Sequence, residues 1–287
     1  MNVLIIGGTG TLGHALVPRL LREGHNVTVF SREEIKQKKM ASLYPECRYV
    51  LGDIRDYESL VPHCFGKTAV FHLAAMKHVD LAEVNLTECI KINLLGSMNV
   101  AKACLEAGVD YAVLSSTDKA VLPINAYGHC KALSERIFFD ANGKGHTLFS
   151  VFRWGNVLGS RGSVLHAFTE TLKKEKKVYI THFDMTRFWI HIEDAAAFML
   201  SNYAFGNNNQ VYIPPMKAAP LVALASATAQ YLGVSDYKIE SIPIRPGEKL
   251  HEWLDYHDPN FEMKSNNSEV YTDEELLGLV ARTLDGK

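Results

Sequence analysis

The sequence predicts an α/β fold, a doubly wound parallel sheet with a smaller C-terminal lobe. Two observations favour it. Short β-branched runs alternate with longer amphipathic stretches through the first half of the chain, which is typical of parallel strands joined by helices. The alternation breaks after Trp154. Ligands of such folds bind beyond the C-terminal ends of the strands, so we expect functional residues there.

The first half contains six runs that we interpret as buried strands. They are NVLII (2–6), NVTVF (26–30), CRYVLGD (47–53), AVFHLAA (69–75), YAVLSST (111–117) and TLFSVFRW (147–154). Two long amphipathic stretches predict helices between them, TLGHALVPRLLREG (11–24) and ECIKINLLGSMNVAKACLEAG (88–108).

In the second half of the sequence, we predict segments that belong to the larger domain, followed by segments that form a smaller lobe. GNVLGSRGSV (155–164) is a glycine-rich loop before a helix, FWIHIEDAAAFMLSNYAF (188–205) is predicted as a helix, and QVYIPP (210–215) as a short strand. A helix and a strand after Leu221 are followed by IPIRPGEKLHEWL (242–254) and by the helix TDEELLGLV (272–280), with Thr272 as N-cap. We therefore assign 1–156 and 188–215 to the larger domain, and 157–187 and 216–287 to the lobe.

Composition excludes several classes of partner. The 287 residues carry a formal net charge of −2, which gives no basic field to attract nucleic acid or an anionic membrane. Five scattered cysteines without CxxC spacing argue against a disulfide framework or a zinc site and fit a reducing compartment. No apolar run approaches the roughly 20 residues of a membrane span, and no leader pattern precedes the first strand. We expect a cytoplasmic protein with no metal, nucleic-acid or membrane partner.

Glycines after the first strand predict a dinucleotide-binding turn. IIGGTGTLGHAL places Gly7, Gly10 and Gly13, with Thr11 and Leu12, between the first strand and the first helix. Such a turn brings backbone amides to a pyrophosphate at the helix N-terminus, and Gly13 would let the helix pack closely. The expected sheet is therefore of the Rossmann type.

The end of the second strand, VFSREE, indicates which dinucleotide binds. Ser31 and Arg32 occupy the place where NAD sites usually have an acidic residue for the ribose 2′-hydroxyl. Arg32 can pair with a 2′-phosphate, so NADP is favoured and NAD is the alternative. Glu33 and Glu34 are interpreted as solvent-facing acids at a helix start.

The next two strand ends are expected to contact the same cofactor. Asp53 and Ile54 in GDIRD are placed to flank an adenine ring, although Asp53 could equally cap a helix. Ala74 and Ala75 are small enough for a cofactor to lie flat on the backbone. Close helix–sheet packing would also explain them, and the two interpretations are compatible.

An acid–base pair follows the fifth strand. Tyr127 and Lys131 are four residues apart in a predicted helix, so they lie on one face, one turn apart. A nearby ammonium lowers the pKa of a phenol, and such a Tyr can take a proton from a sugar hydroxyl while hydride leaves the same carbon. Ser115 or Thr117 can hydrogen-bond the same hydroxyl.

Asp118 and Lys119 directly follow Thr117 and suggest a second chemistry. Elimination of water across a carbon–carbon bond needs a base for the C–H proton and an acid for the departing hydroxyl. A buried Asp can stay protonated, and a Lys with a depressed pKa can act as a base. The residues alone leave dehydration and epimerisation equally open, and a solvated turn pair is the plainer interpretation.

Together these motifs resemble those of a known family. GGTGTLG, FSREEIKQ, GDIRD, HLAAMKHV, STDKAVLPINAYGHCKALSE, FRWGNVLGSRGSV, MTRFWI and IRPGEKLHE are similar to segments of the extended short-chain dehydrogenases/reductases. Within that family they are most similar to the soluble, C5-inverting UDP-N-acetylglucosamine 4,6-dehydratases. The resemblance implies an NADP-dependent lyase that acts on a UDP-sugar and gives a 4-keto-6-deoxy product for surface glycans or glycoproteins.

The resemblance also implies residue roles. Thr117, Asp118, Lys119, Tyr127 and Lys131 match catalytic positions, and Tyr127 and Lys131 would also contact the cofactor. The implied substrate-binding set is Lys77, Asn156, Val157, Ser163, Val164, Arg187, Arg245 and Glu248, with Glu252 near the UDP. From the residues alone, Arg187 and Arg245 would be surface arginines. Trp154 occupies a position where the family usually has Tyr.

Three alternative functions stay open at this point. They are a UDP-sugar 4-epimerase, a UDP-N-acetylglucosamine 5,6-dehydratase and a non-catalytic NADP-binding sensor, because a fold does not fix a function. The resemblance further implies a homo-oligomer, a dimer or larger, with the helices of 88–108 and 127–140 as candidate interfaces.

Overall fold

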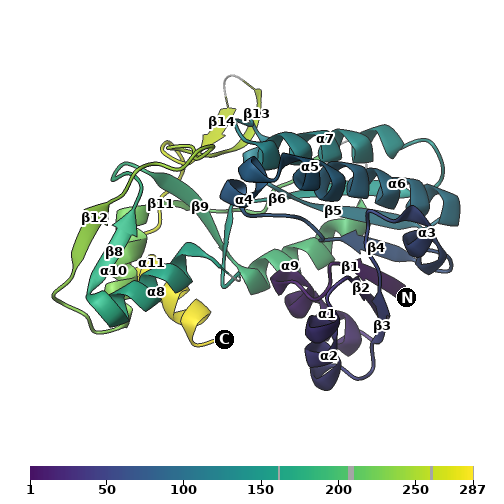
Figure 1. Cartoon of the computed structure of the whole chain (residues 1–287), viewed down its shortest axis with the longest axis horizontal. Helices are drawn as coiled ribbons and strands as arrows, with labels where there is room; N and C mark the ends of the chain where they lie inside the picture. Colours follow the sequence, from purple (N-terminus) through teal and green to yellow (C-terminus); the bar gives the residue numbers. More distant parts are fainter. Residues whose placement is uncertain (161, 206–209, 259–260, 287) are drawn as a thin grey trace.

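A parallel sheet forms the centre of the larger domain. The computed structural model describes residues 1–160, 162–205, 210–258 and 261–286, and within them seven strands form one sheet. Their order is β10-β6-β5-β4-β1-β2-β3, and every neighbouring pair is parallel. Figure 1 shows this sheet between two layers of helices. The predicted doubly wound Rossmann-type fold is confirmed.

The predicted strands of the larger domain are all present. They are β1 (Asn2–Ile6), β2 (Asn26–Ser31), β3 (Arg48–Leu51), β4 (Ala69–His72), β5 (Tyr111–Thr117), β6 (Leu148–Trp154) and β10 (Val211–Tyr212). One detail of the prediction is wrong, because β3 is not buried. It is the edge strand beside β2, and its end residues Arg48 and Leu51 are exposed.

Two hydrophobic clusters attach helices to the two faces of the sheet. One face carries α1 (Thr11–Arg22), α2 (Glu34–Leu43) and α9 (Ile192–Asn202). The other carries α3 (Tyr57–Leu60), α6 (Gly96–Ala107) and α7 (Ala126–Ala141). The predicted helix of 88–108 is present as α5 (Leu86–Cys89), a π-helical segment (Ile90–Leu95) and α6. Shorter elements are α4 (Val79–Val84) and the 3-10 turns Val61–His63, Asp118–Ala120 and Tyr203–Phe205.

A third hydrophobic cluster lies in a separate group of elements, at the left of Figure 1. These elements are α8 (Val164–Glu175), β8 (Lys177–Ile180), α10 (Leu221–Tyr231), β12 (Lys238–Ser241) and α11 (Asp273–Leu284). Thr272 caps α11 as predicted, since its hydroxyl accepts a hydrogen bond from the Glu275 amide and the Glu275 carboxylate accepts one from the Thr272 amide. We call this group, with the segments that join it, the lobe.

The prediction of a helix over 188–205 is wrong in its first part. Thr186–His191 is the strand β9, which pairs with β7 (Asn156–Leu158) and β11 (Ala218–Pro220). Residues 187–191 are all buried, and a short apolar run buried on both sides has no helical or strand periodicity to read. The hairpin β13 (Trp253–Asp258) and β14 (Phe261–Lys264) also lies outside what the sequence predicted.

Candidate active site

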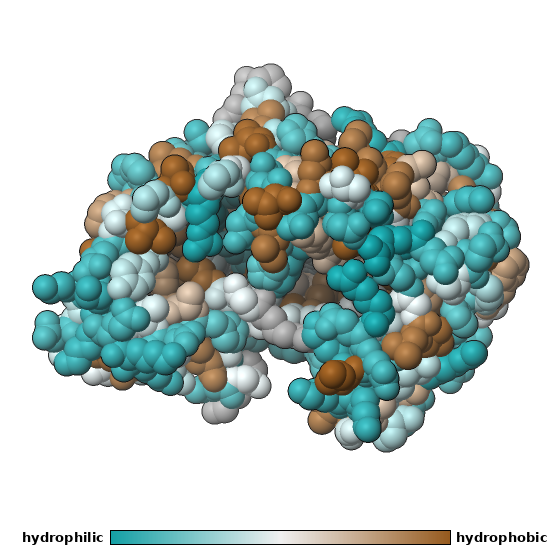
Figure 2. Space-filling view, viewed as in Figure 1, coloured by the Kyte–Doolittle hydropathy of each residue, from teal (hydrophilic) through white to brown (hydrophobic). Residues whose placement is uncertain are grey.

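A cavity of about 1090 Å³ lies along the C-terminal ends of the parallel strands. Figure 2 shows the surface hollowed between the lobe and the larger domain. The predicted site residues that line the cavity are Gly7, Gly10, Thr11, Leu12, Gly13, Ser31, Arg32, Asp53, Ile54, Ala74, Ala75, Lys77, Thr117, Lys119, Tyr127, Asn156, Val157, Ser163, Val164, Arg187, Arg245 and Glu248. Asp118 and Lys131 do not line it; both side chains are buried behind it.

The glycine turn is shaped by close backbone contacts. Gly7 has φ of +78°, and a Cβ there would lie 2.6 Å from the Ala74 amide nitrogen. A Cβ on Gly13 would lie 2.0 Å from the Gly8 carbonyl oxygen, so the predicted close packing of the first helix is confirmed. The turn opens into α1, whose N-cap residue Gly10 makes no side-chain cap hydrogen bond. These residues fit a dinucleotide pyrophosphate.

The ends of β2 and β3 form the next part of the cavity. Arg55 donates two hydrogen bonds to Asp53 Oδ2, at 2.7 and 3.0 Å. Arg32 Nη1 lies 4.0 Å from the same oxygen, and its side chain is 55% exposed. Burial would raise the pKa of Asp53, but Arg55 and Arg32 together lower it. Arg32 is thus held loosely at the cavity edge, where a phosphate could reach it.

Asp53 is not the N-cap of the helix that follows, because Asp56 caps it. Asp56 caps α3 by accepting the Ser59 amide, whereas Asp53 accepts the Arg55 amide at 3.0 Å. Glu33 and Glu34 lie at the start of α2 and are exposed, as predicted.

Tyr127 lies in the first turn of α7, which Asn125 caps by accepting the Gly128 amide. The Tyr127 side chain is 8% exposed and lines the cavity beside Thr117. Burial raises the pKa of Tyr127 to about 12, while Lys119 and a hydrogen bond with Thr117 oppose that rise. Lys119 is thus an ammonium that lowers the pKa of this phenol, and the same effect of Lys131 stays a prediction.

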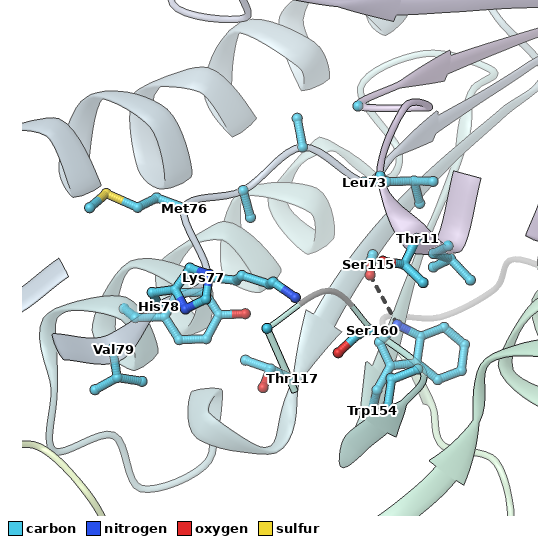
Figure 3. Close-up of a pocket in the computed structure, with 18 of the residues that line it drawn as sticks. Thr11, Leu73, Met76, Lys77, His78, Val79, Ser115, Thr117, Trp154 and Ser160 are labelled. Atoms are coloured by element: carbon cyan, nitrogen blue, oxygen red, sulfur yellow. Dashed lines mark hydrogen bonds between the residues drawn. The ribbon is translucent and has the colours of Figure 1, made fainter. Parts of the chain in front are cut away.

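Lys131 shares the buried face of α7 with Tyr127 but contacts the sheet. Its Nζ donates a hydrogen bond to the Ser115 carbonyl oxygen at 2.7 Å. Burial lowers the pKa of Lys131 to about 8, against the opposing effect of Glu135. The other side of Ser115 accepts a 3.0 Å hydrogen bond at its hydroxyl from Trp154 Nε1, which Figure 3 shows as a dashed line.

Asp118 and Lys119 form an ion pair between a buried carboxylate and a half-buried ammonium, rather than a solvated turn. Lys119 Nζ lies 2.9 Å from Asp118 Oδ1, which also accepts a hydrogen bond from the Thr117 hydroxyl at 3.0 Å. Asp118 is fully buried, and Lys119 alone of the pair reaches the cavity. Burial would lower the pKa of Lys119, but Asp118 and Glu252 outweigh it and raise the pKa. Lys119 therefore lacks the depressed pKa that would make a lysine a base on its own.

The two predicted arginines differ in exposure. Arg245 is exposed at the cavity, whereas Arg187 is 5% exposed, so Arg187 is not a surface residue. Arg187 donates to the carbonyl oxygens of Lys249 at 2.8 Å and Leu250 at 3.1 Å. Glu248 Oε1 lies 3.8 Å from its Nη2. Arg187 therefore fixes the 248–250 segment against β9.

The remaining residues that the resemblance assigns to the substrate line the same cavity. Lys77 extends its amine into the cavity in Figure 3, close to Thr117 and Ser160 in that view. Asn156 Oδ1 lies 3.5 Å from Lys119 Nζ. Ser163 and Val164 lie at the start of α8, and residue 161 of the predicted 155–164 loop lies outside the described residues.

Two buried contacts near the site carried no signal in the sequence. Arg153 and Glu135 form an ion pair at 2.7 Å, and Arg153 also donates to the Leu254 carbonyl oxygen at 2.6 Å. Lys249 Nζ donates to the Val121 carbonyl oxygen at 2.6 Å. The Arg153–Leu254 and Lys249–Val121 contacts join the segment around β13 to the larger domain. No motif marks them, because their partners are far apart in the chain.

The parallel sheet, the glycine turn and the Tyr127–Lys131 pair after β5 define a protein of the short-chain dehydrogenase/reductase type. The chain belongs to the polysaccharide biosynthesis protein family, whose profile matches residues 3–273. The resemblance inferred from its motifs is thereby confirmed.

Comparison with characterised proteins refines this placement. The chain is 44% identical over 259 residues to a UDP-N-acetylglucosamine 4,6-dehydratase (inverting) of Campylobacter jejuni, covering 88% of this chain and 76% of that protein. It is 36% identical over 263 residues to a UDP-glucose 4-epimerase of Rickettsia rickettsii, covering 88% and 77%. The dehydratase is thus the more similar of the two.

Solved structures agree on the fold. Pen from Bacillus thuringiensis superposes with a TM-score of 0.93 at 32% identity, covering 99% of this chain and 97% of that one. A dTDP-glucose 4,6-dehydratase from Streptomyces venezuelae, solved with NAD bound, gives a TM-score of 0.83 at 21% identity, covering 100% and 98%.

The described residues hold neither a candidate membrane span nor a candidate metal centre. None of the helices among them is both long and apolar enough to cross a membrane. Nor do they contain a group of three or more His, Cys, Asp or Glu side chains that could hold a metal ion.

Proposed function

We propose that this protein is a UDP-N-acetylglucosamine 4,6-dehydratase that inverts C5 and uses NADP. The observation that carries the proposal is the Asp118–Lys119 ion pair beside Tyr127, with Lys119 in the cavity. Epimerisation at C4 needs one acid–base group at O4, whereas elimination needs further proton transfers at C5 and at O6. The 44% identity to an inverting dehydratase supports the same reaction.

The first proton transfer in this proposal belongs to Tyr127. The Tyr127 phenol takes the O4 proton, with Thr117 hydrogen-bonded to it and Lys119 favouring the phenolate. Ser115, held by Trp154 and Lys131, orients the same region of the cavity. When bound, the nicotinamide supplies the hydride acceptor and donor for C4 and C6. Oxidation at C4 makes the C5 proton acidic.

The Asp118–Lys119 pair carries out the proton transfers at C5 and at O6. Lys119 reaches the cavity, so it is the group that contacts the sugar, and Asp118 acts through it. Passing a proton from Lys119 to Asp118 leaves a neutral amine, which takes the proton from C5. The pair then returns a proton to the departing C6 hydroxyl, which leaves as water. A later proton delivered to the opposite face of C5 inverts that centre.

The preference for NADP over NAD is part of the proposal. Arg32 is 55% exposed at the end of β2, with its nearest acidic partner, Asp53, engaged mainly by Arg55. An arginine so placed can pair with a 2′-phosphate. Ser31 completes a strand end without an acidic group for a ribose 2′-hydroxyl.

We further propose how the chain is organised. Residues 1–156 and 188–215 would bind the cofactor, and 157–187 and 216–287 the nucleotide-sugar. A cytoplasmic homo-oligomer is the proposed state. Exposed apolar side chains on and next to the 88–108 and 127–140 helices, Leu95, Met98 and Leu133, support an interface there.

The reaction can be tested by proton NMR of UDP-N-acetylglucosamine incubated with the purified protein in deuterated water, first without added cofactor. A new C6 methyl signal, with deuterium at C5 and L-arabino couplings, is expected. A UDP-N-acetylgalactosamine signal would establish the epimerase instead, and an alkene signal the 5,6-dehydratase. No conversion, even with NADP⁺ added and other nucleotide-sugars supplied, would favour the sensor.

Two substitutions test the assignment of the ion pair. Asp118→Asn and Lys119→Ala should each abolish elimination while NADP still binds. Full dehydratase rates in both variants would show that the assigned roles are wrong.

A further inference from the structure

Carboxylates from two distant parts of the chain surround the Lys119 ammonium. Its Nζ lies 2.9 Å from Asp118 Oδ1 and 3.4 Å from Glu252 Oε1. Asp118 belongs to the turn after β5, whereas Glu252 immediately precedes β13 in the chain. Lys119 therefore lies where the segment from the lobe meets the strand ends of the larger domain.

Glu252 is held in this position by its own set of contacts. It is 2% exposed and lines the cavity. Its amide donates to the Ser265 hydroxyl and its carbonyl oxygen accepts the Ser265 amide, both at 2.9 Å. Glu252 Oε2 lies 3.4 Å from Lys249 Nζ and has no hydrogen-bond partner among the described residues. Burying a carboxylate this deeply costs folding free energy unless positive charges pair with it. Lys119 and Lys249 provide those positive charges.

We infer that Glu252 is a positioning residue of the active site, whose carboxylate holds the Lys119 ammonium in the cavity against Asp118. The inference rests on the proposed function, in which Lys119 exchanges protons with the sugar. It goes beyond the position near the UDP that the resemblance implied, because the ion pairs of this carboxylate are with Lys119 and Lys249.

The charges that face Lys119 come from every element packed around it. Asp118 lies on its own turn, Tyr127 on α7, Arg187 on β9, and Glu252 on the segment before β13. Burial lowers the pKa of Lys119, Asp118 and Glu252 together raise it, and Arg187 opposes them. Loss of the Glu252 charge should therefore increase the fraction of neutral Lys119 at any given pH.

Kinetics of Glu252→Gln provide the first test. We expect kcat to fall about tenfold, because the amine is no longer held, with KM changed by less than about twofold. The limb of the pH–rate profile that reports Lys119 should move to lower pH by at least about half a unit. An unchanged kcat and profile, or a raised KM with an unmoved profile, would overturn the inference.

A second readout does not depend on the substrate. A pulse of acetic anhydride acylates only neutral amines, so acetylation of Lys119 relative to exposed Lys39 reports its protonation. In Glu252→Gln this ratio should rise at least about threefold, the equivalent of half a pKa unit. An unchanged ratio contradicts the inference. If the wild-type protein fails to dehydrate UDP-N-acetylglucosamine, the proposed function fails while this assay still tests Glu252.

Matched variants separate this role from general effects. Glu269→Gln removes an exposed carboxylate of the lobe that pairs with Lys217, and both readouts should match the wild type. Glu252→Asp keeps the charge on a shorter side chain, so its acetylation ratio should fall between wild type and Gln. This variant carries the test if Glu252→Gln does not fold. An Asp variant with the wild-type ratio and wild-type kcat would count against a positioning role.

Discussion

Trp154 Nε1 donates a 3.0 Å hydrogen bond to the Ser115 hydroxyl, across the C-terminal ends of β5 and β6. The carbonyl oxygen of the same serine accepts a 2.7 Å bond from Lys131 Nζ. Ser115 is therefore fixed from two sides. The indole supplies this bond at a position where the resemblance implied Tyr.

This bond predicts a coupled effect of two substitutions. Trp154→Phe and Ser115→Ala should each lower stability by about 1 kcal/mol and reduce kcat several-fold, since each removes the same hydrogen bond. The double variant should add little to either single variant. Urea unfolding and steady-state rates of the three variants provide the measurement, and fully additive losses would show that the two residues act separately.

Arg32 should determine cofactor preference. Arg32→Ala is expected to weaken NADP binding by about tenfold or more, because one charge-assisted contact to the 2′-phosphate is lost, and to leave NAD binding nearly unchanged. Isothermal titration with both cofactors checks this, with the exposed Lys39→Ala of α2 as control. Equal weakening of the two cofactors would argue against a 2′-phosphate contact.

Two glycines in helices should respond oppositely to alanine. A Cβ on Gly13 would meet the Gly8 carbonyl oxygen at 2.0 Å, so Gly13→Ala should destabilise the protein by about 3 kcal/mol. Gly278 in α11 has nothing within 4 Å of its Cβ position, and Gly278→Ala should stabilise the protein by about 0.5–1 kcal/mol. Chemical unfolding of both variants measures these changes in stability. Similar unfolding midpoints for the two variants would contradict the packing argument.

Buried His72 predicts a loss of stability in acid. Burial, assisted by the charge of Lys131, lowers the pKa of His72 to about 3 in the folded protein. The unfolded chain, with a pKa of about 6.5, then binds the proton more tightly, so stability present at neutral pH is lost as the pH falls from about 6.5 towards 3.

The His72 contribution can be isolated by substitution. Between pH 7 and pH 5, the wild type should lose about 2 kcal/mol through this residue, and His72→Gln should lose less. Urea unfolding at the two pH values measures the difference, with exposed His129→Gln as control. The same loss in the wild type and in His72→Gln would assign the acid sensitivity to other groups.

Most of the fold could be predicted from local sequence patterns. Residues close together in the chain determine the alternation of strands and helices. The same holds for the glycine turn, the Thr272 cap and the spacing of Tyr127 and Lys131. Each depends on backbone geometry within a few residues. The sequence predicts a helix where β9 lies, because residues 187–191 are all buried and so lack the periodicity that distinguishes a strand from a helix.

The sequence by itself determined the sheet, the dinucleotide turn and which residues gather at its strand ends, because parallel strands bring their ends together wherever the chain alternates in this way. Only the tertiary structure decided how those groups are charged. In the folded protein Asp118 is buried, the Glu252 carboxylate pairs with Lys119, and Lys249 donates a hydrogen bond to Val121, 128 residues away in the chain. The protonation of a side chain depends on desolvation and on charges within a few ångströms, and those neighbours come from segments that only folding brings together.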